Sequence, residues 1–360
     1  MLYLQQIIPG PERVRLRLHA VALLFAGPAC LAAPVPAPRT VPLESVSPLA
    51  STAEIVRRTF SPTSQDRLRQ VQAKSGKAPP EYSVDPAKEE LEIFVPPLPA
   101  SGRYGLLVFV MPAHSLRMPE DWRKPLEKAG FIYVSALRSG NAQSVLERRI
   151  PLAVHAYEYA RSRYPIDPER VFVGGFSGGS RMAQWTSMAY SDVFRGAMLV
   201  GGSLQIGEYE VVFPPRDLAL RFLSGTRLVF ATGSEDALNG GIDRRNRKVL
   251  ESLCFRGYSR VSQLRLGHWL PSGAGLARVL DELQKPVPAD PEFESCVQGL
   301  NLDIDRRLAE VESLIAAGRM KEAGVALGEM EDRYGGLAGE RAVPLARTIA
   351  AALAATASAE

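Results

Sequence analysis

The sequence contains few of the side chains that bind transition metals. Histidine occurs four times and cysteine three times in 360 residues. Protein zinc sites use three or four Cys, His or carboxylate ligands held close together. Too few residues of these types surround the cysteines to form such a cluster, so the sequence predicts no metal site.

Charge of one sign is also not in large excess. The chain has 43 basic and 39 acidic residues, which gives a net charge of +4. Without residues 1–32, which hold three arginines and one glutamate, the net charge falls to +2. Nucleic-acid-binding domains usually carry a basic patch or stripe. The sequence shows neither, so nucleic acid is excluded as a predicted partner.

The mature chain is predicted to have no transmembrane helix. The N-terminal apolar run, Ala20–Leu31, is shorter than the ~20 residues that span a bilayer. Three arginines precede it at positions 13, 15 and 17, and Ala32 and Ala33 follow it. This order is typical of a cleaved export signal. We expect cleavage after Ala32 and a bacterial protein that is periplasmic or secreted; a buried N-terminal helix is the alternative.

Cys30 introduces a second alternative at this end, a lipid-anchored protein. The residues before it, Gly27-Pro28-Ala29, lack the leucine expected in a lipoprotein signal, so lipid anchoring is less favoured than simple cleavage. A Pro/Ala-rich stretch then reaches about Pro48 and predicts a flexible tether. Residues 49–75 have helical patterning, and we assign residues 33–75 to one N-terminal segment.

Removal of the signal would leave two cysteines, Cys254 and Cys296. An even pair in an oxidising compartment indicates one disulfide. It would close a loop of about 40 residues, for which the chain-entropy model gives roughly 4 kcal/mol. Two buried thiols are the alternative.

Residues 76–300 form the predicted main domain. From residue 91 onward, short apolar runs alternate with amphipathic stretches, as in a mostly parallel sheet with helices on both faces. The predicted strands are Leu91–Val95, Leu106–Val110, Phe131–Ser135, Val171–Val173, Gly196–Val200, Arg227–Ala231 and Val261–Leu266. The predicted helices are Glu120–Ala129, Val145–Tyr164, Gly178–Tyr190, Asp243–Phe255 and Gly273–Leu283.

Residues 301–360 differ in composition, being rich in Ala, Glu, Leu and Arg. They predict a helical hairpin with its turn at Ala316–Met320, and a third helix over Ala342–Ala355. The hairpin resembles one TPR-like unit, which is too little for a free-standing repeat array. We expect a helical appendage that packs on the main domain; a weak protein partner for these helices is the alternative.

The most informative motif is Gly175-Phe176-Ser177-Gly178-Gly179. It follows the apolar run Val171–Val173 and precedes a predicted helix. A G-x-S-x-G sequence on a strand-to-helix turn is a nucleophile elbow, which exposes the serine hydroxyl at the end of the sheet. Ser177 is therefore the candidate nucleophile, and an ordinary Gly-Ser turn is the alternative.

Hydrolases built around such an elbow place first the acid and then the histidine after the serine in the chain. His268 is the only histidine after Ser177, so it is the candidate general base. Asp236, in the loop after the sixth predicted strand, is the candidate acid that orients it. Glu235 and Asp243 are rivals for that role, and an Asp at this place can instead cap the next helix.

Two backbone amides are expected to stabilise an oxyanion. That of Gly178 lies at the start of the helix after Ser177. The second is expected in the loop after the strand Leu106–Val110, where Ala113 and His114 are the candidates. This loop lacks the His-Gly-Gly-Gly element of many lipases and esterases.

Several segments together resemble the α/β-hydrolase superfamily: Tyr104–Val110, Ser139–Asn141 with Arg149, Tyr164–Val171, Gly175–Ala183 and Asp192–Gly196. They are most similar to secreted esterases of the polyhydroxybutyrate-depolymerase and feruloyl-esterase type, over roughly Tyr82 to Leu283. The resemblance implies an α/β-hydrolase fold and a serine esterase without a cofactor. It carries over Ser177, Asp236 and His268 by motif position. A tryptophan-rich surface is absent, which argues against polymer substrates.

The sequence thus predicts an exported serine hydrolase that cleaves a small-molecule carboxylic ester through an acyl-enzyme. A peptidase or amidase with the same three residues is the first alternative. A non-catalytic binding protein with the same fold is the second.

Overall fold

The computed structural model describes residues 36–44, 46–77, 81, 84–207 and 211–357, all of which belong to one compact unit. The predicted export signal, with its cleavage site after Ala32 and with Cys30, lies outside the described residues. None of the described helices combines the length and apolar character needed to cross a membrane.

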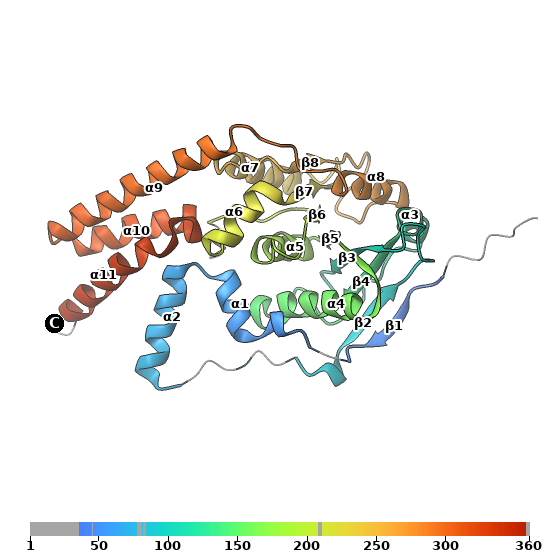
Figure 1. Ribbon diagram of the computed structural model, residues 1–360, viewed down its shortest axis with the longest axis horizontal. Coiled ribbons are helices and arrows are strands. Elements are labelled where there is room, and N and C mark those ends of the chain that lie inside the picture. Colours follow the sequence, from blue (N-terminus) through green and yellow to red (C-terminus); the bar gives the residue numbers. More distant parts are fainter. Residues whose placement is uncertain (1–35, 45, 78–80, 82–83, 208–210, 358–360) are drawn as a thin grey trace, which may run out of the picture. The chain divides into compact units, whose positions relative to one another are not determined.

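Within the described residues, one sheet is formed by eight strands in the order β1-β2-β4-β3-β5-β6-β7-β8 (Figure 1). β2 is antiparallel to both of its neighbours, and all other neighbouring strands are parallel. The strands are β1 (Arg39–Pro42), β2 (Glu90–Phe94), β3 (Tyr104–Val110), β4 (Phe131–Ala136), β5 (Ile166–Phe176), β6 (Gly196–Val200), β7 (Arg227–Phe230) and β8 (Tyr258–Arg260).

The described α-helices precede the sheet, connect its strands or follow it. They are α1 (Thr52–Thr59), α2 (Pro62–Ser75), α3 (Arg123–Ala129), α4 (Ile150–Arg163), α5 (Gly178–Ala189), α6 (Arg216–Gly225), α7 (Ala237–Ser252), α8 (Gly273–Leu283), α9 (Phe293–Ala316), α10 (Met320–Tyr334) and α11 (Ala342–Ala357). The strand order, the antiparallel second strand and the helices on both faces make this the α/β-hydrolase fold, as the sequence predicts.

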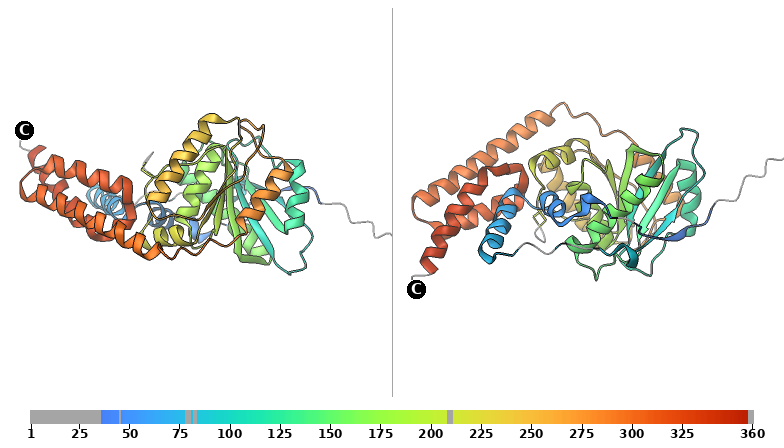
Figure 2. Two further views of the ribbon diagram at one scale, coloured as in Figure 1. Left: turned by 90° about the horizontal axis from the view of Figure 1, so that it is seen from above. Right: turned by 60° about the horizontal axis from the view of Figure 1, so that its bottom comes forward.

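The central strands are apolar along their length because helices cover both faces of the sheet (Figure 2). Successive residues of β3 enter two different cores: Leu106 and Val108 belong to one buried cluster, Leu107 and Phe109 to the other. This alternation follows from the two-residue period of a strand. The first cluster includes residues of α4, α5, α6 and the C-terminal helices, and the second includes residues of α3 and α8.

Four elements in and beside the sheet differ from the sequence-based expectations. The strand predicted at Val261–Leu266 is wrong, because β8 ends at Arg260 and the following residues turn, with Arg265 at φ +54°. The sequence analysis did not identify β1 or α6. α7 begins six residues earlier than predicted, at Ala237.

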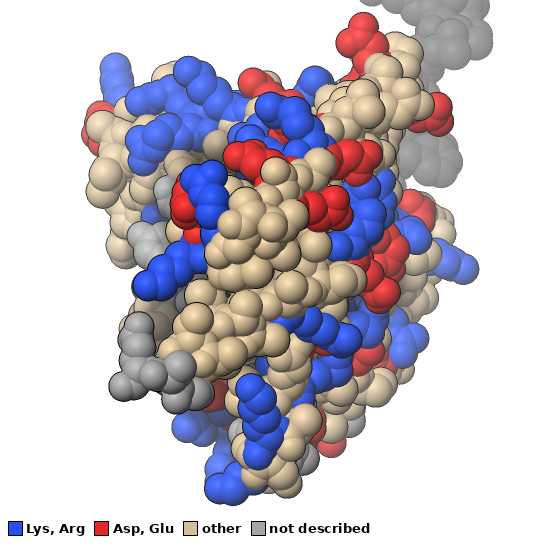
Figure 3. All heavy atoms as spheres, turned by 90° about the vertical axis from the view of Figure 1, so that its left-hand side faces the viewer, with Lys and Arg blue, Asp and Glu red and all other residues tan. Residues whose placement is uncertain are grey.

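The C-terminal helices pack on one another and on α2 and α6. Arg216 of α6 donates hydrogen bonds to the Leu337 carbonyl (2.6 Å) and to the Asn301 side chain (2.9 Å). Arg347 of α11 pairs with the buried Asp66 of α2 at 2.6 Å and holds the pKa of that carboxyl well below its usual range. In Figure 3, basic and acidic side chains mix with a broad band of uncharged atoms on this side of the molecule.

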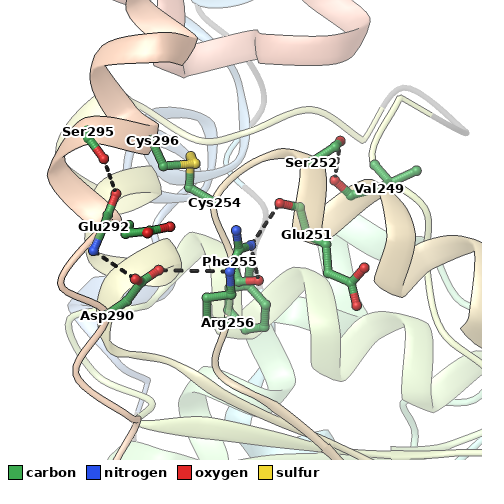
Figure 4. The surroundings of a disulfide bond; sticks show 10 residues. All are labelled: Val249, Glu251, Ser252, Cys254, Phe255, Arg256, Asp290, Glu292, Ser295 and Cys296. Carbon is green, nitrogen blue, oxygen red and sulfur yellow. Dashed lines mark hydrogen bonds and ion pairs between the residues drawn. A yellow bond between two sulfur atoms is a disulfide. The ribbon is translucent and has the colours of Figure 1, made fainter.

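A disulfide joins the end of α7 to the start of α9 (Figure 4). Cys254 follows α7, and Cys296 lies in the first turn of α9, with 5.9 Å between their Cα atoms. The sequence separation is 42 residues, so the chain-entropy model assigns roughly 4 kcal/mol to the bond.

Intact-mass analysis of protein exported to the periplasm tests this bond. In the denatured, unreduced protein, an alkylating reagent should label neither Cys254 nor Cys296, whereas reduction should make both reactive. Cys296→Ser should lower the free energy of unfolding by roughly 4 kcal/mol. Two labelled cysteines without reduction would contradict the prediction.

A hydrogen bond to a buried histidine connects the N-terminal segment to the main domain. His155 of α4 is 3% exposed, and its Nδ1 accepts a hydrogen bond of 2.8 Å from the Ser47 backbone N–H. The accepting nitrogen carries no proton, and burial lowers the pKa of His155 to about 4. His155 is therefore neutral in the folded protein at pH 7.

This lowered pKa predicts a loss of stability in mild acid. The unfolded chain takes up a proton on His155 near pH 6.5, whereas the folded chain does so only near pH 4. The stabilisation is present above pH 6.5 and is lost as the pH falls from 6.5 to 4, by up to about 3 kcal/mol. His155→Gln, which cannot titrate, should reduce this pH dependence in chemical denaturation. An unchanged slope between pH 4 and 6.5 would contradict the assignment.

Candidate active site

The turn at Ser177 joins β5 to α5 where backbone segments approach one another closely. Ser177 has φ 55° and ψ −119°, a conformation that L-residues rarely adopt, and its N–H donates to the Val200 carbonyl at 2.8 Å. A Cβ atom on Gly175 would lie 2.1 Å from the Gly179 carbonyl oxygen, and one on Gly179 would lie 1.9 Å from that of Val110. Glycine is therefore required at both positions, and the sequence has it.

The structure brings together Ser177, His268 and Asp236. His268 Nε2 lies 2.9 Å from Ser177 Oγ, and His268 Nδ1 lies 2.6 Å from Asp236 Oδ2. The His268 side chain is 43% exposed, whereas that of Asp236 is 6% exposed. The imidazole thus connects a buried carboxylate to a hydroxyl that solvent can reach.

Asp236 is held by two elements at once. It is the N-cap of α7, where its side chain accepts from the Asn239 backbone N–H at 3.3 Å. The Asn239 side-chain amide also lies 2.9 Å from each oxygen of the carboxylate. Burial alone would raise the pKa of Asp236, but the hydrogen bonds from His268 and Asn239 outweigh burial and keep this pKa below its ordinary value. Asp236 therefore caps α7 and contacts His268 at the same time.

The two rival carboxylates lie elsewhere. Glu235 is exposed, and its backbone N–H donates to the Leu266 carbonyl. Asp243 is buried in α7 and accepts from the Ser203 hydroxyl at 2.7 Å and from the Thr232 hydroxyl at 2.5 Å. Burial raises the pKa of Asp243, and these two hydrogen bonds offset only part of the rise. Asp243 therefore connects the loops that follow β6 and β7 instead of contacting the imidazole.

Sequence reasoning missed Asn239. Its Nδ2 lies 3.2 Å from His268 Nδ1 in addition to its contacts with Asp236, and its Oδ1 accepts from an Arg181 Nη2 at 3.2 Å. Arg181 in α5 is thereby connected to the acid. The signal was available, since a helix that starts at Ala237 places Asn239 in the first turn, but the predicted start at Asp243 concealed it.

The proposed oxyanion donors lie at the start of α5 and in the loop that follows β3. The contact of Gly179 with the Val110 carbonyl sets the end of β3, and the loop that leaves it, beside the start of α5. Ala113 and His114 lie in that loop, and in the described part of the chain neither their amides nor that of Gly178 donate to a backbone or side-chain acceptor. All three remain available to a ligand.

Among the described residues, no group of three or more His, Cys, Asp or Glu side chains is arranged to hold a metal ion.

No protein-family description and no curated protein sequence matches the chain. Among solved structures, it is similar to a thermostable esterase (15% identity, TM-score 0.40, 55% of this chain and 57% of that one). It is similar to the acylaminoacyl peptidase of Pyrococcus horikoshii, with 16% identity and a TM-score of 0.42 over 58% of this chain and 42% of the peptidase. It is also similar to the S-formylglutathione hydrolase FrmB of Staphylococcus aureus, with 9% identity and a TM-score of 0.40 over 55% of this chain and 93% of FrmB. The chain thus spans little more than half of the esterase and less than half of the peptidase. Similarity at this level does not identify a substrate.

Replacing Asp236 should distinguish it from its rivals. Asp236→Asn keeps the side-chain oxygen that caps α7 but disfavours the tautomer of His268 that accepts the serine proton, at a cost of up to ~10⁴ in turnover, by analogy with trypsin. Glu235→Gln and Asp243→Asn should each remain within about tenfold of wild type, or ~1.4 kcal/mol in the barrier. Ester hydrolysis by the three purified variants decides this, and an equal loss in either control would reassign the acid.

Proposed function

We propose that this chain is a serine hydrolase that cleaves carboxylic esters of small molecules through an acyl-enzyme intermediate. One observation carries the proposal: contacts of 2.9 and 2.6 Å connect the Ser177 hydroxyl, the two ring nitrogens of His268 and the Asp236 carboxylate. A base aligned with a serine and oriented by a buried acid is the arrangement that activates a hydroxyl for acyl transfer.

The reaction follows from the roles of these groups. Ser177 Oγ attacks the ester carbonyl while His268 Nε2 takes its proton, and Asp236 stabilises the resulting imidazolium through Nδ1–H. The tetrahedral oxyanion accepts hydrogen bonds from the amide of Gly178 and from that of Ala113 or His114, where one donor is typically worth about 3 kcal/mol. His268 then protonates the leaving alcohol. Water, deprotonated by His268, hydrolyses the acyl-enzyme.

The surroundings of the site favour a substrate with an apolar part. Three large apolar side chains on the segments that carry Asp236 and His268 are exposed: Leu238 (75%), Leu264 (81%) and Trp269 (60%). Trp269 packs edge-on against Phe176, whose ring also lies 4.9 Å from the imidazole of His268. An apolar acyl or alcohol group covering Trp269 would gain roughly 25 cal/mol for each Å² removed from water.

Within the superfamily, the motif resemblance assigns the chain to the group of secreted esterases related to polyhydroxybutyrate depolymerases and feruloyl esterases. The arginine-flanked apolar segment at the N-terminus supports export to the periplasm or medium. Export also agrees with a disulfide between Cys254 and Cys296, because such bonds persist in oxidising compartments.

A panel of p-nitrophenyl esters with acyl chains of rising length, assayed beside peptide anilides, tests the substrate class. We expect ester hydrolysis that increases with chain length over the short members, and little or no release from the anilides. Preferred cleavage of the anilides would indicate a peptidase or amidase. A fluorophosphonate probe that fails to label Ser177 would indicate a non-catalytic binding protein.

Ser177→Ala should abolish nearly all ester hydrolysis and leave the melting temperature close to that of wild type, because the hydroxyl faces solvent and packs against little. His268→Ala should be similarly severe. His155→Ala is the matched histidine control: it should lower stability but leave kcat nearly unchanged at temperatures where the protein is folded. Retained turnover in folded Ser177→Ala protein would refute the assignment of the nucleophile.

A further inference from the structure

The loop after β4 meets both halves of the proposed oxyanion site, and it carries a side chain that the mechanism above does not use. We propose, on the basis of the proposed esterase function, that the side-chain amide of Asn141 is a further hydrogen-bond donor to the oxyanion. It would act beside the amides of Gly178 and His114.

The first observation is the position of the Asn141 carboxamide against Gly178. A Cβ atom on Gly178 would lie 2.2 Å from Asn141 Oδ1, 2.7 Å from its Cγ and 2.9 Å from its Nδ2. The carboxamide therefore occupies the space where any other residue at position 178 would place its side chain. Position 178 is one of the two variable residues of the G-x-S-x-G motif, and here it is glycine.

The second observation is that the backbone of Asn141 is fixed to the other half of the site. Its N–H donates to the Pro112 carbonyl at 2.8 Å. Because the carbonyl and N–H of one trans peptide point in opposite directions, this bond turns the Ala113 N–H away from Asn141, which leaves the His114 amide as the backbone donor beside the Asn141 carboxamide. A Cβ atom on the preceding residue, Gly140, would lie 3.2 Å from Ala113 Cα and 3.4 Å from His114 N. The two loops are thus in direct contact.

Hydrogen bonds from two buried side chains also fix the loop. Arg149 is 4% exposed and donates from Nε to the Ser139 carbonyl at 2.7 Å, and the Ser139 hydroxyl donates to the Ala136 carbonyl at 2.9 Å. These bonds fix the backbone just before Asn141. A donor on a fixed backbone does not have to be reorganised during the reaction, which is the property that makes oxyanion donors effective.

The third observation is that the Asn141 carboxamide has unused hydrogen-bonding capacity. The residue is exposed, and in the part of the chain that the structure describes its side chain makes no hydrogen bond. A half-turn about χ2 exchanges Oδ1 and Nδ2, so the NH₂ group can take either of the two places beside Gly178. The side chain is therefore positioned by packing and remains free to donate.

A side-chain donor would also replace a group of backbone donors that the sequence lacks. The loop Met111–Ser115 lacks the glycine-rich element that supplies backbone donors in many esterases. A carboxamide from the neighbouring loop supplies an N–H to the same place by another route. Loss of one side-chain donor of this kind lowers kcat by about 10²-fold to 10³-fold.

The test compares Asn141→Ala and Asn141→Asp with Gln143→Ala, which removes a carboxamide two residues further along the same loop. With a p-nitrophenyl ester, both Asn141 variants should lose about 10²-fold to 10³-fold in kcat with KM within about threefold of wild type. Affinity for a trifluoromethyl ketone, which forms a tetrahedral oxyanion on Ser177, should fall in parallel with kcat. Gln143→Ala should match wild type in all three measurements.

A double-mutant cycle examines the contact with Gly178. Gly178→Ala keeps its N–H but places a methyl group where the Asn141 carboxamide lies, so it should also lower kcat. If both changes act through the carboxamide, the double variant should be little worse than Asn141→Ala alone. Fully additive losses would overturn the proposal.

The remaining outcomes separate this inference from the proposed function. Wild-type kcat in Asn141→Ala, together with an inactive Ser177→Ala, would overturn the role of Asn141 and leave the esterase assignment intact. A loss confined to KM or to the melting temperature would show that Asn141 only supports the loop. Failure of the wild-type protein both to hydrolyse the substrate panel and to react with a fluorophosphonate would overturn both proposals.

Discussion

The close approach of three backbone segments at Ser177 is the constraint on which the site depends. The end of β3, the end of β5 and the start of α5 meet where Gly175 and Gly179 leave no Cβ atom between them. This contact forces Ser177 into its unusual conformation and places the first amides of α5 beside the loop that leaves β3. The strain of one residue, about 1–3 kcal/mol, is small compared with the packing of the strands and helix that impose it.

The acid of the site shows how one side chain serves both structure and chemistry. Asp236 accepts hydrogen bonds that begin α7, and the same carboxylate faces the imidazole of His268. Burial disfavours the ionised carboxylate of Asp236, and the hydrogen bonds from His268 and Asn239 favour it. The helix cap therefore sets the orientation of the acid before any substrate arrives, so the site is preorganised by the fold itself.

The sequence predicted the parts of the molecule that are buried on both faces or fixed by a motif. β6 and α8 match their predicted bounds because they are apolar runs or amphipathic periods ended by clear signals. The edge strands β1 and β8 escaped detection because they are short and partly exposed, while Val261–Leu266 alternates like a strand yet turns at Leu264 and Arg265. Ser177, Asp236 and His268 could be selected from chain order and the scarcity of histidine. Asn239 was missed because the predicted start of α7 was six residues too late, and Asn141 was missed because its position depends on how two loops meet in space.

The disulfide and the acid lie at opposite ends of the same helix. α7 has 16 residues, which corresponds to a length of about 24 Å, with Asp236 before its first turn and Cys254 after its last. Cys254 joins this helix to α9 and so to the C-terminal helices. Reduction of the bond therefore releases the end of α7 that is remote from the carboxylate. The disulfide thus joins the C-terminal helices to the main domain at a point separated from the hydrogen-bonded carboxylate by the full length of α7.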